Sequence, residues 1–156
     1  MSKMIIGTVA ALTFCLTVGC AHTETKTAEV DTKGAVRFDE KIREKCGDKA
    51  GDAYFAYDST SLSTAAADRL DSLAACFTTG ALKDRSLNVV GYTDPVGGKM
   101  YNKDLGKARA DNVAMYLQQK GVPATRLNVY SRGEEGASPD PANWPADRMV
   151  DITLVP

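Results

Sequence analysis

The chain has little histidine and no surplus of positive charge, and each absence excludes a class of function. His22 is the only histidine among 156 residues, so neither a histidine-based metal site nor a catalytic triad built on histidine is expected. The 19 basic and 20 acidic residues give a net charge of −1, without the lysine and arginine surplus that nucleic-acid binding needs. We therefore expect no metal, no cofactor and no nucleic-acid partner.

Long apolar runs are scarce as well. The run over residues 4–18 follows Lys3, and it is shorter than the roughly 20 apolar residues of a transmembrane helix. We interpret it as the hydrophobic part of a secretory signal peptide over residues 1–19.

The end of this run points to a lipid anchor. Residues 17–20 read TVGC, which resembles a bacterial lipobox, although Thr17 replaces the usual leucine. The resemblance implies cleavage before Cys20 and lipidation of that cysteine. Because Ala21 rather than aspartate follows, it also implies sorting to the outer membrane, with the folded part in the periplasm. The alternative is an ordinary signal peptide in which Cys20 is incidental.

The mature chain divides into a tether and one domain. Residues 20–45 contain few large apolar side chains, so we expect a solvated, flexible tether. Residues 46–156 should then form the domain. Within it, Cys46 and Cys76 form an even pair in an exported protein, which favours a disulfide. Two buried free thiols are the alternative.

The hydrophobic periodicity predicts alternating strands and helices. We expect strands at residues 53–57, 87–92, 127–131 and 149–155, and helices at 64–77 and 101–120. Ser63 is a suitable N-cap, Gly121 a C-cap, and Pro123 prevents continuation of the second helix. The order β-α-β-α-β-β predicts an α/β (α+β) sandwich, in which two helices cover one face of a mixed four-stranded sheet. A loop rich in glycine and proline is expected at residues 133–147.

Several short motifs are spaced along this pattern. The central set is Gly91-Tyr92-Thr93-Asp94, Gly97, Tyr101-Asn102, Leu105-Gly106, Arg109-Ala110 and Tyr116-Leu117. Flanking matches include Phe55-Ala56-Tyr57-Asp58-Ser59, Arg132-Gly133-Glu134 and Asp147-Arg148-Met149-Val150-Asp151-Ile152. Together they resemble the OmpA-like domain family, to which the peptidoglycan-associated lipoprotein belongs, over residues 53–154. The resemblance implies non-catalytic binding of peptidoglycan.

The resemblance also implies a receptor for the diaminopimelate side chain of peptidoglycan stem peptides, whose free end carries an ammonium and a carboxylate. Asp94 would accept hydrogen bonds from the ammonium, and Arg109 would bind the carboxylate with its planar fork. Neither residue lies on the expected core stripe, so alanine at either position should leave the fold intact. The alternatives are a turn-forming Asp94 and a solvated Arg109.

Further site residues follow from the same resemblance. Asn102 and Leu105 share a helical stripe with Arg109. Asn102 would contact the ligand or else cap the helix, and Leu105 would pack against the arginine. Backbone groups would come from the turn at Asp58, Ser59 and Thr60, and Arg148 would contribute a second cation or simply pair with a carboxylate.

Two departures from the family pattern concern the same region. Tyr92 stands where histidine is common, and Met149 replaces an arginine, which removes one positive charge near the site. The implied partners are peptidoglycan, the outer membrane through the lipid anchor, and Tol-system or other envelope proteins. Two other functions stay open: an envelope interaction protein with secondary wall binding, and a peptidoglycan hydrolase, for which the sequence offers no enzyme motif.

Overall fold

The structure is a computed structural model that describes residues 36–47 and 55–156. The expected signal peptide, Cys20 and tether residues 20–35 lie outside the described residues. Within the described ranges, no helix is long and apolar enough to cross a membrane.

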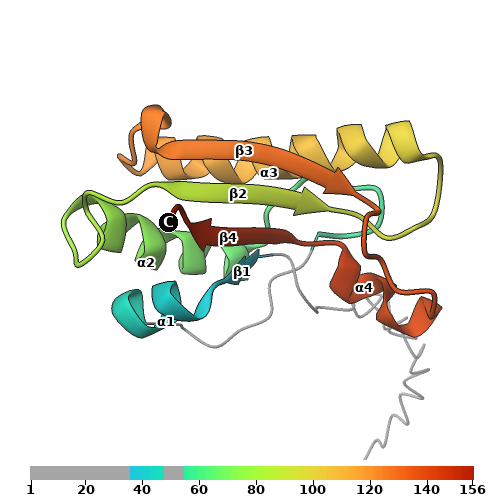
Figure 1. The fold of residues 1–156 in the computed structure, drawn as a ribbon, viewed down its shortest axis with the longest axis horizontal. Coiled ribbons are helices and arrows are strands. Elements are labelled where there is room, and N and C mark those ends of the chain that lie inside the picture. The colour runs from blue at the N-terminus through green and yellow to red at the C-terminus, as the bar shows by residue number, and fades with distance from the viewer. Residues whose placement is uncertain (1–35, 48–54) are drawn as a thin grey trace, which may run out of the picture.

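A mixed four-stranded sheet with the order β1-β4-β2-β3 forms the centre of the domain (Figure 1). The strands are β1 (Val36–Phe38), β2 (Leu87–Tyr92), β3 (Leu127–Gly133) and β4 (Val150–Leu154). β1 pairs with β4, and β2 with β3, in parallel, whereas β2 and β4 are antiparallel. The apolar alternation that predicted β2 and β4 is visible in their burial, since every second residue at the start of each strand is buried.

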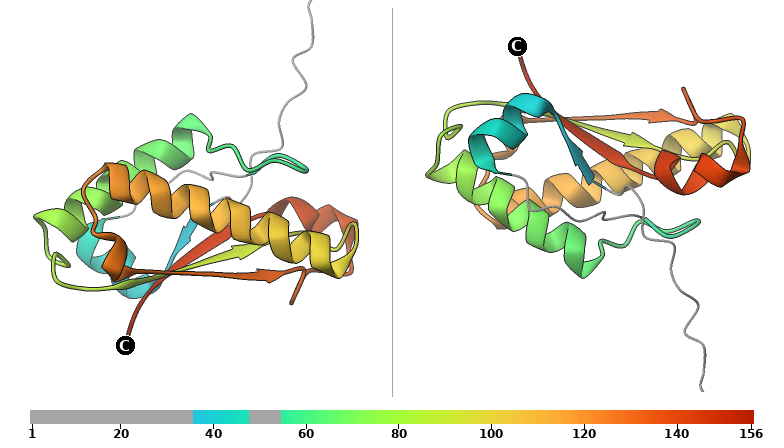
Figure 2. Two further views of the ribbon diagram at one scale, coloured as in Figure 1. Left: turned by 90° about the horizontal axis from the view of Figure 1, so that it is seen from above. Right: turned by 90° about the horizontal axis from the view of Figure 1, so that it is seen from below.

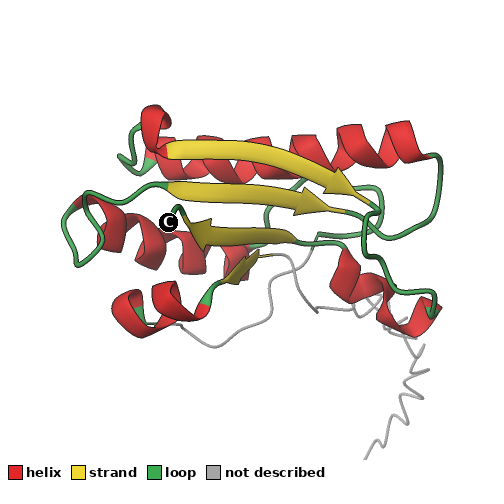
Figure 3. Ribbon diagram, viewed as in Figure 1, coloured by secondary structure: helices red, strands yellow, loops and turns green. Residues whose placement is uncertain are grey.

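Two long helices, α2 (Thr64–Thr78) and α3 (Lys99–Gln119), lie on one face of this sheet (Figure 2). Their inward side chains, among them Leu70, Phe77 and Val113, are fully buried. The Ser63 hydroxyl caps α2 by accepting from the Ala66 N–H at 3.2 Å. The predicted α+β arrangement of two helices on a mixed four-stranded sheet is confirmed (Figure 3).

The first strand lies elsewhere than expected, and a short helix that was not predicted follows it. Residues 55–57 form no strand, and the sheet edge is instead β1, which pairs with β4. Helix α1 (Glu40–Cys46) follows at once, and the Asp39 side chain accepts from the Ile42 N–H at 2.7 Å and the Leu154 N–H at 2.8 Å. The predicted tether is therefore wrong for residues 36–45. Pairing with β4 compensates for the shortness of β1, and this tertiary contact is invisible in the sequence.

The segment between β3 and β4 is also more regular than the predicted loop. It contains a 3₁₀ turn, η2 (Pro141–Asn143), and a short helix, α4 (Trp144–Asp147). Another 3₁₀ turn, η1 (Ala124–Arg126), precedes β3. η2 and α4 lie near the end of the sheet at which β2 and β3 finish, whereas η1 lies at the opposite end, where β3 begins (Figure 1).

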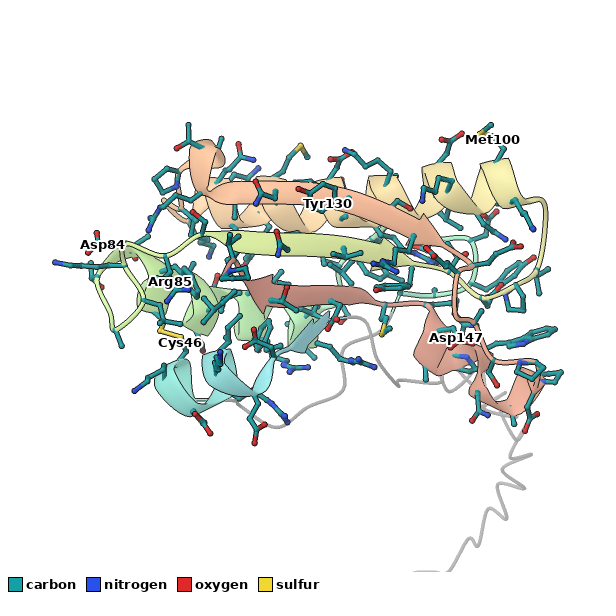
Figure 4. All side chains as sticks on the ribbon, viewed as in Figure 1. Cys46, Asp84, Arg85, Met100, Tyr130 and Asp147 are labelled. Atoms are coloured by element: carbon teal, nitrogen blue, oxygen red, sulfur yellow. A yellow bond between two sulfur atoms is a disulfide. The ribbon has the colours of Figure 1, made fainter. Side chains whose placement is uncertain are left out.

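Cys46 and Cys76 are joined by a disulfide between α1 and α2, with Cα atoms 5.5 Å apart (Figure 4). The bond ties the N-terminal helix to the main core across 30 positions of sequence. Oxidation of both cysteines in the cell stays a prediction.

Two glycines bring α3 against β2. A Cβ on Gly91 would lie 1.8 Å from the Gly106 carbonyl oxygen, and a Cβ on Gly106 would lie 2.5 Å from the Ser131 hydroxyl. Only glycine allows backbones to approach so closely. Asp94 lies three residues after Gly91, and Arg109 three residues after Gly106, so this contact positions both predicted charges.

Candidate ligand-binding site

All four of the buried polar or charged side chains in the described part of the chain line one pocket. They are Thr93, Asp94, Asn102 and Arg109, each at most 5% exposed. The pocket lies where β2 ends and α3 begins, and its remaining lining residues are Tyr57, Asp58, Val96, Tyr101 and Leu105. Burying a polar group is unfavourable unless a partner compensates for the lost water. Their gathering in one place therefore makes this pocket the candidate ligand-binding site.

Arg109 is a fully buried side chain that donates to three backbone carbonyls in two segments of the chain. Its Nε donates to the Ser59 carbonyl at 2.8 Å, and its terminal nitrogens donate to the Tyr92 carbonyl at 3.0 Å and the Ala56 carbonyl at 3.3 Å. The guanidinium carbon lies 5.2 Å from the centroid of the Phe55 ring. The expectation that alanine at this position would leave the fold intact is wrong, because it would remove the donors of three carbonyls and create a cavity.

The charge of Arg109 lacks a contacting counter-ion. Within residues 36–47 and 55–156, no carboxylate comes within salt-bridge distance of its guanidinium. Burial lowers the pKa of Arg109 to about 10, against the attraction of Asp94, so the group stays charged at neutral pH. A buried cation whose direct contacts are carbonyl dipoles and an aromatic ring is only partly compensated. A ligand carboxylate would supply the missing negative charge.

Asp94 is held from two sides. One carboxylate oxygen accepts from the Val96 N–H at 3.0 Å, which is the turn-forming contact considered as its alternative role. The other lies 3.4 Å from a terminal nitrogen of Arg148. Arg148 also donates from Nε to the Phe55 carbonyl at 3.2 Å, and it does not line the pocket. Arg148 therefore orients Asp94 by pairing with its carboxylate. Of the two roles considered for Arg148, a second cation for the ligand or a partner for a carboxylate, this is the second.

The α3 residues predicted beside Arg109 lie in the pocket. Asn102 donates from its side chain to the Glu134 carboxylate at 2.6 Å, and no side chain caps the start of α3. Helix capping is therefore not the role of Asn102. Leu105 is half-buried and lines the pocket one turn before Arg109.

The turn at residues 58–60 serves mainly to hold α3. The Ser59 carbonyl accepts from Arg109, as described above, and the Thr60 carbonyl accepts from the Asn112 side chain at 3.0 Å. Asp58, which lines the pocket, accepts a hydrogen bond from the Tyr101 hydroxyl. Ser59 and Thr60 are not part of the lining.

Sequence reasoning assigned no role to Thr93, Tyr57 or Tyr101. The Thr93 side chain is buried, and its hydroxyl has no hydrogen-bond partner among the described residues. Its place directly before Asp94 in the central motif was the signal that could have identified it. Similarly, Tyr57 and Tyr101 directly precede Asp58 and Asn102, two residues that were assigned to the site.

The fold and the pocket define an α+β domain with one buried polar site. The model of the OmpA family matches residues 54–148, more than half of the chain, and the chain belongs to this family. Outer membrane protein A of Serratia odorifera is 35% identical over 103 residues, which cover 66% of this chain and 42% of that protein. Outer membrane protein A of Serratia marcescens is 35% identical over 86 residues, which cover 55% of this chain and 24% of that protein. The chain thus spans less than half the length of these relatives.

Solved structures share the fold. The peptidoglycan-associated lipoprotein from Burkholderia pseudomallei is 28% identical with a TM-score of 0.61, covering 66% of this chain and 88% of that one. The C-terminal domain of Helicobacter pylori MotB is 20% identical with a TM-score of 0.60, covering 69% and 86%. The OmpA-like domain of FopA1 from Francisella tularensis is 22% identical with a TM-score of 0.58, covering 66% and 68%. The last two comparisons concern the fold alone.

Proposed function

We propose that this chain binds the diaminopimelate end of peptidoglycan stem peptides without catalysis, and that a lipid on Cys20 anchors it to the outer membrane. The observation that carries the wall-binding proposal is the gathering of four buried polar side chains around one pocket, with an arginine whose charge has no contacting carboxylate. The likeness to a peptidoglycan-associated lipoprotein supports the choice of ligand.

The chemistry of the ligand complements the pocket. The free end of diaminopimelate carries an ammonium and a carboxylate on one carbon atom. Arg109 supplies a buried cation for the carboxylate, and Asp94 supplies an anion for the ammonium. The long contact between Asp94 and Arg148, 3.4 Å, leaves Asp94 able to accept a second cation. In this low-dielectric setting, charge contacts are stronger than they are in water.

Sedimentation of the purified chain with purified diaminopimelate-type peptidoglycan tests the proposal. Asp94→Asn preserves the shape of the side chain and the hydrogen bond that it accepts from the Val96 N–H. Arg109→Lys preserves a positive charge. Each variant should bind at least about 30-fold more weakly, because removing one partner of a desolvated charge contact costs about 2–5 kcal/mol. The matched control is Lys107→Ala, which removes an exposed cation from the same helix and should bind like the parent.

Competition and ligand type sharpen the test. Free diaminopimelate should release the parent chain from the wall. Lysine-type peptidoglycan, whose side chain ends in an ammonium alone, should bind more weakly because Arg109 then gains no counter-ion. Parent-like binding of well-folded Asp94→Asn and Arg109→Lys would contradict the assignment. Release of soluble wall fragments would instead favour a hydrolase.

The anchor is tested separately. Several acyl chains hold a protein on a membrane stably, whereas a single chain binds only marginally. The variant Cys20→Ser should therefore leave the outer-membrane fraction while the purified chain still binds the wall. Unchanged fractionation of this variant would contradict lipid anchoring without affecting the pocket.

A further inference from the structure

Two exposed tyrosines stand on the rim of the pocket. Among the described residues, five large hydrophobic side chains are more than half exposed: Tyr57, Met100, Tyr101, Met115 and Tyr130. Tyr57, at 64%, and Tyr101, at 52%, line the pocket together with Asp94 and Arg109. Isolated exposed hydrophobic residues are ordinary. Two aromatic residues at the mouth of a buried polar site call for another explanation, because neither core packing nor binding of a zwitterion uses their exposed faces.

The rim tyrosines, Tyr57 and Tyr101, are connected through Asp58. The Tyr101 hydroxyl donates to the Asp58 carboxylate and so joins the first turn of α3 to the segment before α2. Asp58 has a φ of +51°, a left-handed conformation that residues other than glycine rarely adopt. This bond restrains the edge of the Tyr101 ring while half of the side chain stays exposed. Tyrosine also loses little conformational freedom on binding, because its side chain has only two rotatable angles.

We propose that the rim tyrosines contact an N-acetylhexosamine ring of the glycan strand to which the bound stem peptide is attached. This inference rests on the proposed function. A stem peptide held by its diaminopimelate end must leave the pocket across the rim on its way to the sugar. The C–H groups of a sugar ring carry partial positive charge and pack against the negative face of an aromatic ring. The sugar hydroxyl and acetamide groups can stay in water.

Calorimetry with two soluble ligands tests the contact. One is a diaminopimelate-containing tripeptide, and the other is the same tripeptide attached to the N-acetylglucosamine–N-acetylmuramic acid disaccharide. The parent should bind the disaccharide ligand about two- to tenfold more tightly than the peptide alone, the range that aromatic packing contributes. In Tyr57→Ala and in Tyr101→Ala the ratio of the two affinities should fall toward one.

Two further variants separate the ring from other effects. Tyr101→Phe keeps the ring but loses the hydrogen bond to Asp58, and it should retain most of the ratio. Tyr130→Ala removes a tyrosine of similar exposure, 53%, from the sheet face opposite the long helices (Figure 4). It should leave the ratio unchanged.

The outcomes are distinct. A ratio of one in the parent, or a parent-like ratio in both alanine variants, would overturn the inference while leaving the proposed function standing. Equal losses in Tyr101→Phe and Tyr101→Ala would also overturn it, because the hydroxyl rather than the ring face would be responsible. Failure of the parent to bind either ligand would remove the proposed function itself.

Discussion

The core between the helices and the sheet differs from the pocket at the end of β2 in what it buries. Between α2, α3 and the sheet, buried side chains such as Leu70, Phe77 and Leu87 are apolar. Around the end of β2 and the first half of α3, the buried side chains also include a threonine, an aspartate, an asparagine and an arginine. Apolar packing and the proposed binding site thus occupy neighbouring regions, which meet where Gly91 touches Gly106. Substitutions at the junction and in each region test this separation.

The largest effect is expected at the junction. In Gly91→Ala the new Cβ would lie 1.8 Å from a backbone oxygen, which cannot move aside as a flexible side chain can. Overpacking commonly costs 1–3 kcal/mol, and a clash with backbone should cost about 4 kcal/mol or more in free energy of unfolding. Urea denaturation measures this loss of unfolding free energy. Wall binding should fall as well, because the clash would move Asp94 and Arg109 apart.

Gly98→Ala is the control for this substitution. A Cβ on Gly98 meets nothing within 4 Å, and replacing glycine by alanine at this N-cap should cost only about 1 kcal/mol. Similar unfolding free energies for Gly91→Ala and Gly98→Ala would show that the close approach does not hold the two regions together.

The second-largest effect is expected from removing the disulfide, which should lower stability without weakening wall binding. Replacing Cys46 and Cys76 with serine removes a crosslink across 30 residues, for which the chain-entropy model gives about 3–4 kcal/mol of stabilisation. Unfolding free energy should fall by that amount, while wall binding below the melting temperature should persist. Reducing agent should have the same effect on the parent. Mass spectrometry after alkylation without reductant would contradict the disulfide if it found two modified thiols.

The smallest effect is expected from a substitution in the pocket that should raise stability but weaken ligand binding. Thr93→Val replaces a buried hydroxyl without a described partner, so the free energy of unfolding should rise by about 1 kcal/mol. We propose that the ligand supplies the missing partner of this hydroxyl, so affinity for diaminopimelate peptide should fall by roughly two- to tenfold. Thr153→Val, at a partly exposed position of β4, should change neither quantity much. A less stable Thr93→Val would mean that the hydroxyl supports the fold.

The main elements were predictable because local signals agree with the tertiary structure. Ser63 caps α2 as expected, and the alternating apolar residues of β2 and β4 face the helices. β1 was missed because it has three residues and depends on pairing with β4. The aromatic run at residues 53–57 had the stronger strand signal, yet residues 55–57 form no strand.

Part of the candidate site's membership was predictable, but not its arrangement. The family motif brought Asp94, Asn102, Leu105 and Arg109 together, and all of them line the pocket. The burial of Arg109 could not be read from its helix, since its carbonyl partners at Ala56 and Ser59 are 53 and 50 residues away in sequence. Long-range contacts also explain why Ser59 and Thr60 hold α3 instead of lining the pocket.

The position of the disulfide determines how the domain would carry tension. A pull on the chain ahead of β1 reaches Cys46 at the end of α1, and the covalent bond passes it directly to Cys76 in α2. The shortest covalent path between the two cysteines then bypasses the chain between them. The bypassed chain includes Ala56 and Ser59, whose carbonyls hold Arg109. A protein that is stretched between two layers could therefore keep its arginine in place for as long as this one crosslink is oxidised.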